Sequence, residues 1–262
     1  MKSRALLTLA LLFAISSTGA FAAQFKALLI TNTAGWHHDS IGAAVPALQE
    51  LAKLHDFDLV WPNDLGSVLT DKGLAGYQVI IFALTTGDIL NDDQQAAVQR
   101  FVESGKGFVT IHTGTDTEYG WPWYTKMEGA TFFIHPAVQT ATVVVQDPNF
   151  PGMDRFAPRS LRTEEWYQFK TPLANDCHIL LTVDESTYNP NVKWGPSGDR
   201  EAREGHGMGD VHPISWYHEY DGGRSFTTIL GHLPATYSDP VFLHHVYGGI
   251  YWAATGKGFR AK

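Results

Sequence analysis

Gly107-Phe-Val-Thr-Ile-His-Thr-Gly-Thr-Asp116 is the stretch that decides the fold, because an apolar run stops abruptly at a histidine. Residues 108–111 are β-branched or aromatic and predict a buried strand. The small residues after His112 predict a tight turn. In open parallel sheets, ligands bind in the crevice beyond the carboxyl ends of the strands. The alternative is a capped, hydrogen-bonded surface histidine, so the rest of the chain has to decide the role of His112.

Working outward from this strand, apolar runs alternate with helical patterns. Further strands are expected at 25–31, 57–61 and 77–84, with helices at about 39–55 and from Asn91 to Gly105. This alternation predicts a parallel sheet with right-handed crossovers. The second half is less regular, with strands expected at 141–146, 178–183, 213–219 and 224–230 and a closing helix at 240–255. We expect one domain over residues 24–262, and a long mobile loop over 189–209.

Residues 1–23 have the pattern of a secretory signal peptide. Lys2 and Arg4 precede an apolar stretch, and Ala20-Phe-Ala22 is a small-x-small cleavage site. We therefore expect the mature chain to reside in the periplasm or outside the cell, without a membrane anchor.

Composition excludes several classes of partner and cofactor. The chain has 19 Lys and Arg against 27 Asp and Glu, a net charge of -8 that becomes -10 once Lys2 and Arg4 are removed. An acidic chain without basic runs argues against nucleic acid or an anionic membrane as partner. No glycine-rich nucleotide loop is present, so neither a nucleotide nor a flavin is expected as cofactor. Cys177 is the single cysteine, and we expect it to pack rather than react.

Polar residues follow two of the other predicted strands. His37 and His38 come after the first strand, beside a helix start that Asp39 or Ser40 can cap. We favour a functional role for His38 and a solvated surface position for His37. Thr85-Thr-Gly-Asp88 follows the third strand, so Thr86 and Asp88 are binding candidates, although both can equally form a hydrogen-bonded turn.

Carboxylates and histidines supply the remaining candidates. Asp116 follows His112 closely, whereas the nearby aromatic residues 121–124 are more typical of core. His135 precedes a proline, and Glu164 and Glu165 precede Trp166, whose contact can raise a carboxyl pKa towards neutrality. Alternation does not decide which of the two glutamates points inward.

Two histidines near the end of the chain complete the set. His212 begins a predicted strand, and His232 ends one in the same context as His112. His112, His135 and His232, with a carboxylate, can hold a catalytic zinc, which we keep as an alternative because no close ligand pair supports it.

Taken together, these segments resemble the ThuA-like (trehalose utilisation) family, in order over nearly the whole mature chain. The segments that carry the resemblance are residues 34–41, 85–88, 107–112, 116–119, 135–136, 164–167, 184–188, 212–213 and 223–232. The resemblance implies a class I glutamine amidotransferase-like fold, that is, a flavodoxin-like three-layer α/β sandwich with a mostly parallel central sheet. It also implies a role in carbohydrate use, in some operons on disaccharides oxidised at carbon 3. Where amidotransferases carry a cysteine nucleophile this chain has His112, so amidotransferase chemistry is not expected.

We therefore expect an exported protein that acts on a sugar, a glycoside or its 3-keto derivative by acid–base chemistry. His112 or His232 would transfer the proton, with Glu165 or Asp116 as the carboxylate partner. Substrate contacts are expected from His38, Thr86, Asp88, His135, Trp166 and His212. A non-catalytic sugar-binding module and a metal-dependent hydrolase are the alternatives. The sequence identifies no cofactor beyond that divalent metal, and it leaves the oligomeric state open.

Overall fold

The chain folds around a nine-stranded mixed sheet. A computed structural model describes residues 23–197 and 201–259, so the predicted leader lies outside the described residues except for Ala23. The strand order is β2-β1-β3-β4-β13-β12-β9-β6-β7. Their bounds are β1 (Lys26–Ile30), β2 (Asp58–Val60), β3 (Val79–Ala83), β4 (Gly107–Ile111), β6 (Gln139–Val145), β7 (Arg159–Glu164), β9 (His178–Asp184), β12 (Pro213–Tyr220) and β13 (Gly223–Thr228).

The sheet changes direction between β13 and β12. The five strands β2, β1, β3, β4 and β13 pair in parallel, whereas β12, β9, β6 and β7 continue the sheet antiparallel. The change follows from the tight turn at Asp221–Gly222, where both residues have positive φ and so allow a two-residue hairpin. The parallel half, which carries the predicted strand–helix alternation, places its carboxyl ends along one edge.

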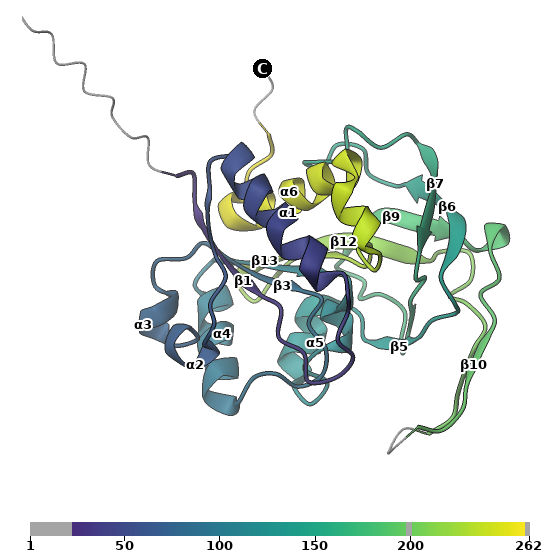
Figure 1. The fold of residues 1–262 in the computed structure, drawn as a ribbon, viewed down its shortest axis with the longest axis horizontal. Helices are drawn as coiled ribbons and strands as arrows, with labels where there is room; N and C mark the ends of the chain where they lie inside the picture. The colour runs from purple at the N-terminus through teal and green to yellow at the C-terminus, as the bar shows by residue number, and fades with distance from the viewer. Residues whose placement is uncertain (1–22, 198–200, 260–262) are drawn as a thin grey trace, which may run out of the picture.

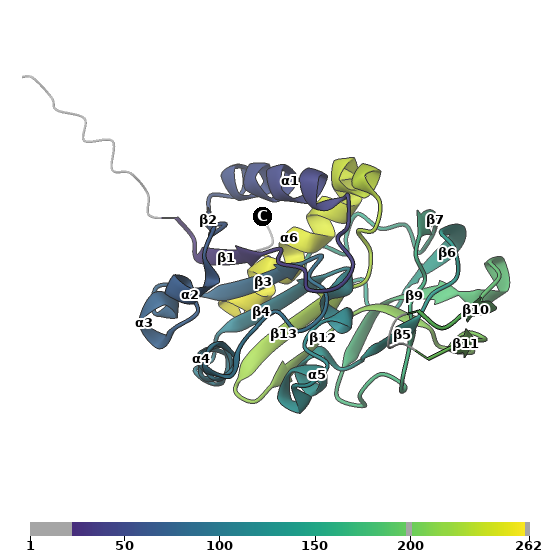
Figure 2. The same ribbon diagram turned by 60° about the horizontal axis from the view of Figure 1, so that its bottom comes forward.

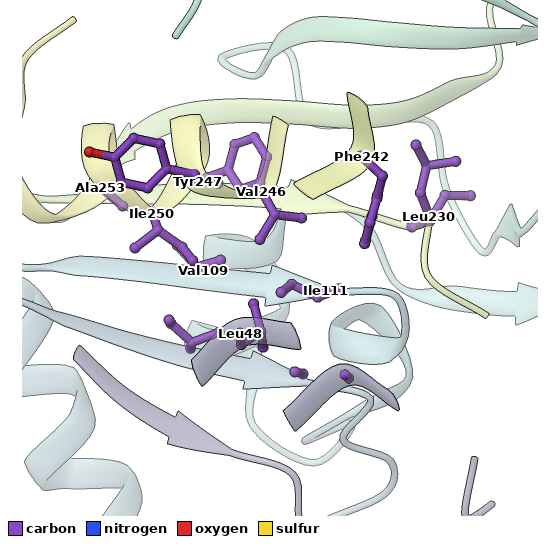
Figure 3. Packing of buried hydrophobic residues seen from close by; sticks show 14 of the residues in the cluster. Leu48, Val109, Ile111, Leu230, Phe242, Val246, Tyr247, Ile250 and Ala253 are labelled. Atoms are coloured by element: carbon purple, nitrogen blue, oxygen red, sulfur yellow. The ribbon is translucent and has the colours of Figure 1, made fainter. Parts of the chain in front are cut away.

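Helices cover both faces of the sheet and produce the expected three-layer α/β sandwich (Figure 2). On one face lie α1 (Ile41–Leu54) and α6 (Pro240–Thr255); on the other lie α2 (Leu65–Val68), α3 (Asp71–Leu74), α4 (Asp92–Glu103) and α5 (Pro122–Glu128). Alternate strand residues feed the two cores, so that Leu29 packs on the α1–α6 side and Leu28 on the α4–α5 side. Figure 3 shows Val246 and Ile250 of α6 packed over Val109 of β4.

The helix ends differ partly from expectation. Asn91 caps α4 in a reciprocal capping box with Gln94, as its sequence predicts. Ser40 at the start of α1 makes no side-chain capping bond, because its backbone is already helical. Cys177 packs against the core, and burial raises the pKa of its thiol to about 12, in keeping with a packing role.

The expectation of a long loop at 189–209 was wrong. Two strands in this segment, β10 (Val192–Trp194) and β11 (Arg203–Gly205), form an antiparallel hairpin that extends from the body (Figure 1). The segment is rich in glycine and charged residues, so the short apolar–polar–apolar pattern from Val192 to Trp194 was not recognised as a strand. A second small ribbon, also not predicted, pairs β5 (Phe132–Ile134) with β8 (Gln168–Phe169). Within the described ranges no helix is long and apolar enough to cross a membrane.

Candidate functional site

A cavity of about 420 Å³ opens near the carboxyl ends of the parallel strands. Aromatic rings and polar groups share its lining, which is the usual composition of a small-molecule site. Its lining residues are Trp36, His38, Asp116, Phe132, His135, Glu165, Tyr167, Trp194 and His232.

His112 lies directly behind this cavity, at the sharp turn where β4 runs into the short 3₁₀ helix η1 (Thr113–Asp116). Its φ of 65° is in the left-handed region, which costs a non-glycine residue about 1–3 kcal/mol and is concentrated at functional sites. The side chain is fully buried. Its Nδ1 lies 2.8 Å from the carbonyl oxygen of Ile229, which can only accept, so Nδ1 carries the proton. In the neutral ring the lone pair is then on Nε2, which lies 3.0 Å from the Tyr167 hydroxyl.

His232 meets His112 because β13 lies beside β4 in the sheet. The two strands pair in parallel up to Thr228 and Ile111, so the residues that follow them leave the sheet together. Nδ1 of His232 is 3.3 Å from Nε2 of His112 and 3.1 Å from Oε2 of Glu165. Burial lowers the pKa of His232, but its hydrogen bond to Glu165 and the nearby carboxylates together raise it above its usual value.

The two adjacent glutamates point in opposite directions. Glu164, the last residue of β7, accepts hydrogen bonds from the backbone amides of Gly231 and His232 and from the Thr236 hydroxyl. Glu165 lies just past the strand and faces the cavity. Burial opposes its ionisation, but hydrogen bonds with His112 and His232 and the charges of His112 and His135 hold its pKa well below the usual range. Glu165 is thus the glutamate of the site, and Glu164 fixes the loop that carries His232.

His38 completes a compact group at the cavity floor. Its ring meets those of His112 and His232 edge-on, with centroids 4.9 and 5.5 Å apart. Burial, and then the neighbouring His112, lower its pKa to about 3, and its buried Nδ1 has no hydrogen-bond partner among the described residues. One ligand atom each from His38, His112, Glu165 and His232 lie within 4.8 Å of one another, as in a metal-binding group. We call these four residues the floor cluster.

The floor cluster differs from the metal alternative read from the sequence. That alternative joined His112 and His232 with His135 and a carboxylate that it did not specify. His135 does line the cavity, but it lies on the other side of Glu165, with its Nε2 3.5 Å from Oε1. The structure groups His38 and Glu165 with the two strand-end histidines instead, because the loop after β1 carries His38 over them.

Several predicted substrate-binding residues do not line the cavity. Thr86 holds the loop after β1, through hydrogen bonds with the amide of Gly35 and the carbonyl of Trp36. Asp88 is exposed to solvent. Trp166 is buried in the core, with its indole nitrogen donating to the carbonyl of Gln139. Thr86 and Trp166 therefore support the structure around the site, whereas Asp88 lies on the surface.

His212 also lies behind the cavity wall. The ring is fully buried, with Nδ1 2.7 Å from Glu185 and Nε2 2.7 Å from the backbone oxygen of Tyr167. It thus supports the residue whose hydroxyl bonds His112. Asp116, by contrast, lines the cavity as expected and accepts a hydrogen bond from the Tyr119 hydroxyl.

Besides Phe132, three aromatic wall residues were not singled out from the sequence. Trp36 sits beside His38, Tyr167 follows the glutamate pair, and Trp194 is carried by the unexpected β10–β11 hairpin. Trp36 and Tyr167 lie in segments 34–41 and 164–167, which carry the family resemblance, so the sequence indicated their importance. Trp194 had none, because its hairpin was taken for a loop.

Comparison with known proteins places this chain in a family. Residues 26–253 match the family ThuA, described as trehalose utilisation. The chain belongs to the ThuA family. No curated protein sequence matches it.

Solved ThuA-like structures share the fold over nearly their whole length. A ThuA-like protein of Bacteroides uniformis ATCC 8492 is 22% identical, with a TM-score of 0.70 and coverage of 91% of this chain and 94% of that one. One of Parabacteroides merdae ATCC 43184 is 20% identical, with a TM-score of 0.67 and coverage of 91% and 92%. A cytoplasmic protein of Salmonella typhimurium is 11% identical, with a TM-score of 0.55 and coverage of 88% and 99%. At these identities the likeness supports the ThuA fold alone.

Proposed function

We propose that this ThuA protein is an enzyme that acts on a sugar or glycoside bound in the cavity, with a 3-keto glycoside as the preferred form. The observation that carries the proposal is the composition of the cavity: aromatic walls stand over a floor of ionisable groups. The trehalose-utilisation description of the family favours a carbohydrate over other small molecules.

The walls suit a sugar ring. Trp36 and Trp194 offer flat apolar faces for the C–H faces of a pyranose, while Asp116 and His135 can hydrogen-bond its hydroxyl groups. Trp36 is 71% exposed, so an incoming ring can cover it without displacing core contacts. A few placed polar groups within an apolar lining fix the orientation of a ligand.

The reactive end of the cavity is the floor, where Glu165 and His232 meet at 3.1 Å. Such a pair can polarise a hydroxyl or carbonyl group, either by proton transfer or through a bound cation. In a 3-keto glycoside the carbonyl acidifies the C–H at carbon 2. Removal of that proton and departure of the aglycone from carbon 1, with a proton supplied to its oxygen, leave an unsaturated ketone. Addition of water then completes a net hydrolysis.

The test is to incubate the purified protein with glucosides, with disaccharides and with their 3-keto derivatives, and to follow aglycone release. We expect turnover of the 3-keto compounds, and loss of turnover in Glu165→Gln. Saccharide binding without turnover of any of these compounds would contradict the proposal and identify a sugar-binding module instead. Absence of both binding and turnover in correctly folded protein would exclude a sugar as the ligand.

A further inference from the structure

The floor cluster brings four potential metal-ligand atoms within 4.8 Å of one another. The carbonyl of Ile229 fixes a proton on Nδ1 of His112, so in the neutral ring Nε2 is the nitrogen that can donate its electron pair. This nitrogen faces Oε2 of Glu165 at 3.5 Å, and a carboxylate oxygen only accepts when it is ionised. His38 adds a buried Nδ1 that has no hydrogen-bond partner within residues 23–197 and 201–259. Buried polar atoms are normally satisfied, so the unpartnered nitrogen of His38, next to these two atoms, indicates that the floor cluster can take a further group.

The spacing of these atoms matches a coordination shell. A tetrahedral ion with bonds of about 2.0–2.1 Å separates its ligand atoms by about 3.3–3.4 Å. In the floor cluster, Nε2 of His112, Nδ1 of His232 and Oε2 of Glu165 are separated by 3.1, 3.3 and 3.5 Å. All three edges of one face of such a tetrahedron are therefore present.

We propose that His112, His232 and Glu165 bind a divalent transition-metal cation, with zinc as the best match and a ring nitrogen of His38 within reach as a further ligand. Two imidazoles and one carboxylate form a donor set typical of catalytic zinc and unsuited to magnesium or calcium, which take oxygen ligands.

The surroundings supply the outer contacts that such a site needs. The Ile229 carbonyl orients His112 at 2.8 Å, and Glu164 holds the backbone amide of His232 at 3.0 Å. Outer contacts of this kind fix the ring that donates to the metal. The cation has to replace the hydrogen bond from Tyr167 to Nε2 of His112, and it thereby frees that hydroxyl at the edge of the cavity.

The site is open on the side where a substrate would lie. His38, Glu165 and His232 all line the cavity, so a ligand there reaches the cation directly. This role rests on the proposed function: the cation would polarise the carbonyl or hydroxyl oxygen of the bound sugar as a Lewis acid. With Glu165 and His232 occupied as ligands, Asp116 is the cavity carboxylate left to accept a proton.

The experiment measures metal binding without any sugar. Tag-free protein purified without chelator is analysed for metal content, stripped by chelator and titrated with zinc and with cobalt. We expect one equivalent of zinc, visible cobalt absorption of tetrahedral intensity, and a rise of about 5–10 °C in Tm at zinc near a hundredfold above Kd. Absence of stoichiometric binding of either ion would overturn the proposal.

Variants locate the ion. His232→Ala and Glu165→Gln should each weaken zinc binding by more than the roughly 100-fold that loss of an outer contact costs. His135→Ala and Asp116→Asn change the same cavity outside the floor cluster and should weaken it by less than about tenfold. His218→Ala tests the group of Asp176, Cys177 and His218 elsewhere in the described chain. Zinc lost in His218→Ala but retained in His232→Ala and Glu165→Gln would place the ion there and refute the proposal. Circular dichroism confirms that each variant is folded.

The outcomes separate this proposal from the proposed function. Zinc bound at the floor cluster without turnover of any sugar would refute the enzyme function and leave the metal site. Turnover that persists in metal-free protein would refute the metal's role and leave the enzyme function.

Discussion

At the scale of single residues, the site depends on side chains that share a sequence context but have different environments. Glu164 and Glu165 are neighbours, yet one holds a loop and the other faces the cavity. His112 and His232 end adjacent strands, yet one is fully buried and the other lines the cavity. Their roles follow from the partners of each atom rather than from residue type.

Glu164→Gln should lower stability more than Glu165→Gln. The carboxylate of Glu164 accepts three hydrogen bonds, and an amide nitrogen in place of one oxygen would face a donor. We expect a loss of about 1–3 kcal/mol in the free energy of unfolding, measured by urea denaturation. Glu165→Gln is the matched control, since it changes the same residue type one position along. Equal losses in both variants would contradict the assignment of Glu164 to structure.

Glu128 is a buried acid outside the floor cluster. It accepts hydrogen bonds from Thr110 at 2.8 Å and Thr227 at 3.3 Å, while its Oε1 has no partner among the described residues. Burial raises its pKa to about 8. The folded protein therefore keeps this carboxyl neutral over a range in which the unfolded chain, with a pKa of 4.5, is ionised.

Glu128→Gln should remove a pH dependence of stability. Between pH 4.5 and about 8, unfolding of the wild type releases the Glu128 proton, so its contribution to stability falls as pH rises. The variant should gain on the wild type by about 1.4 kcal/mol per pH unit across this window. Urea unfolding at pH 5, 6.5 and 8 measures the difference in free energy of unfolding between the variant and the wild type. The contributions of all other titratable groups cancel in this difference. A difference that stays constant with pH would show that Glu128 is ionised in the folded protein.

At the scale of elements, the turn between β4 and η1 places His112. The chain reverses so closely that a Cβ at Gly114 would lie less than 3 Å from the side chain of Thr110. Thr110 is itself buried in the sheet and bonded to Glu128, so it cannot easily move. The glycine is required by this close approach.

Gly114→Ala should destabilise the protein by about 1–3 kcal/mol, because the added methyl group overpacks the turn. Gly42→Ala in α1 is the control, since nothing lies within 4 Å of a Cβ at that position. There we expect no loss, and at most a gain of about 0.5–1 kcal/mol from the better helix former. Thermal unfolding compares the two variants, and a Gly114→Ala protein as stable as Gly42→Ala would refute the close packing of this turn.

At the scale of the whole molecule, the two cores share the same strands. Ile80 and Ile81 are neighbours on β3 and both fully buried, but Ile80 packs on the α4–α5 side and Ile81 on the α1–α6 side. Loss of either core exposes the other face of the same sheet. The domain should therefore unfold as one cooperative unit.

Ile80→Val and Ile81→Val test this coupling as a matched pair. Each should lower the free energy of unfolding by about 0.5–1.5 kcal/mol and shift the same single transition. Calorimetry together with near- and far-ultraviolet circular dichroism measures this unfolding transition. A separate low-temperature transition in only one variant would show that the two helical layers unfold independently.

The sequence allowed the strand–helix alternation of the first half and the position of His112 and His232 at the ends of apolar strands to be predicted, because both depend on local apolar runs. It did not reveal that β13 lies directly beside β4, since that pairing joins residues more than 100 positions apart. The inward direction of Glu165 was also beyond prediction. Glu165 lies past the end of β7, where the alternation of strand residues no longer applies. His38 joined the cluster through a loop whose path depends on Thr86.

The β10–β11 hairpin allows one wall of the cavity to change in sequence independently of the cavity floor. Among the described strands, β10 and β11 pair only with each other, yet Trp194 reaches the cavity. Insertions, deletions and new side chains can therefore accumulate in the hairpin without disturbing the central sheet or the buried histidines. Under the function proposed above, such changes at Trp194 would alter which ligand fits the cavity and leave the floor cluster unchanged. A directed-evolution library confined to residues 192–205 would explore new specificities at little cost in folding.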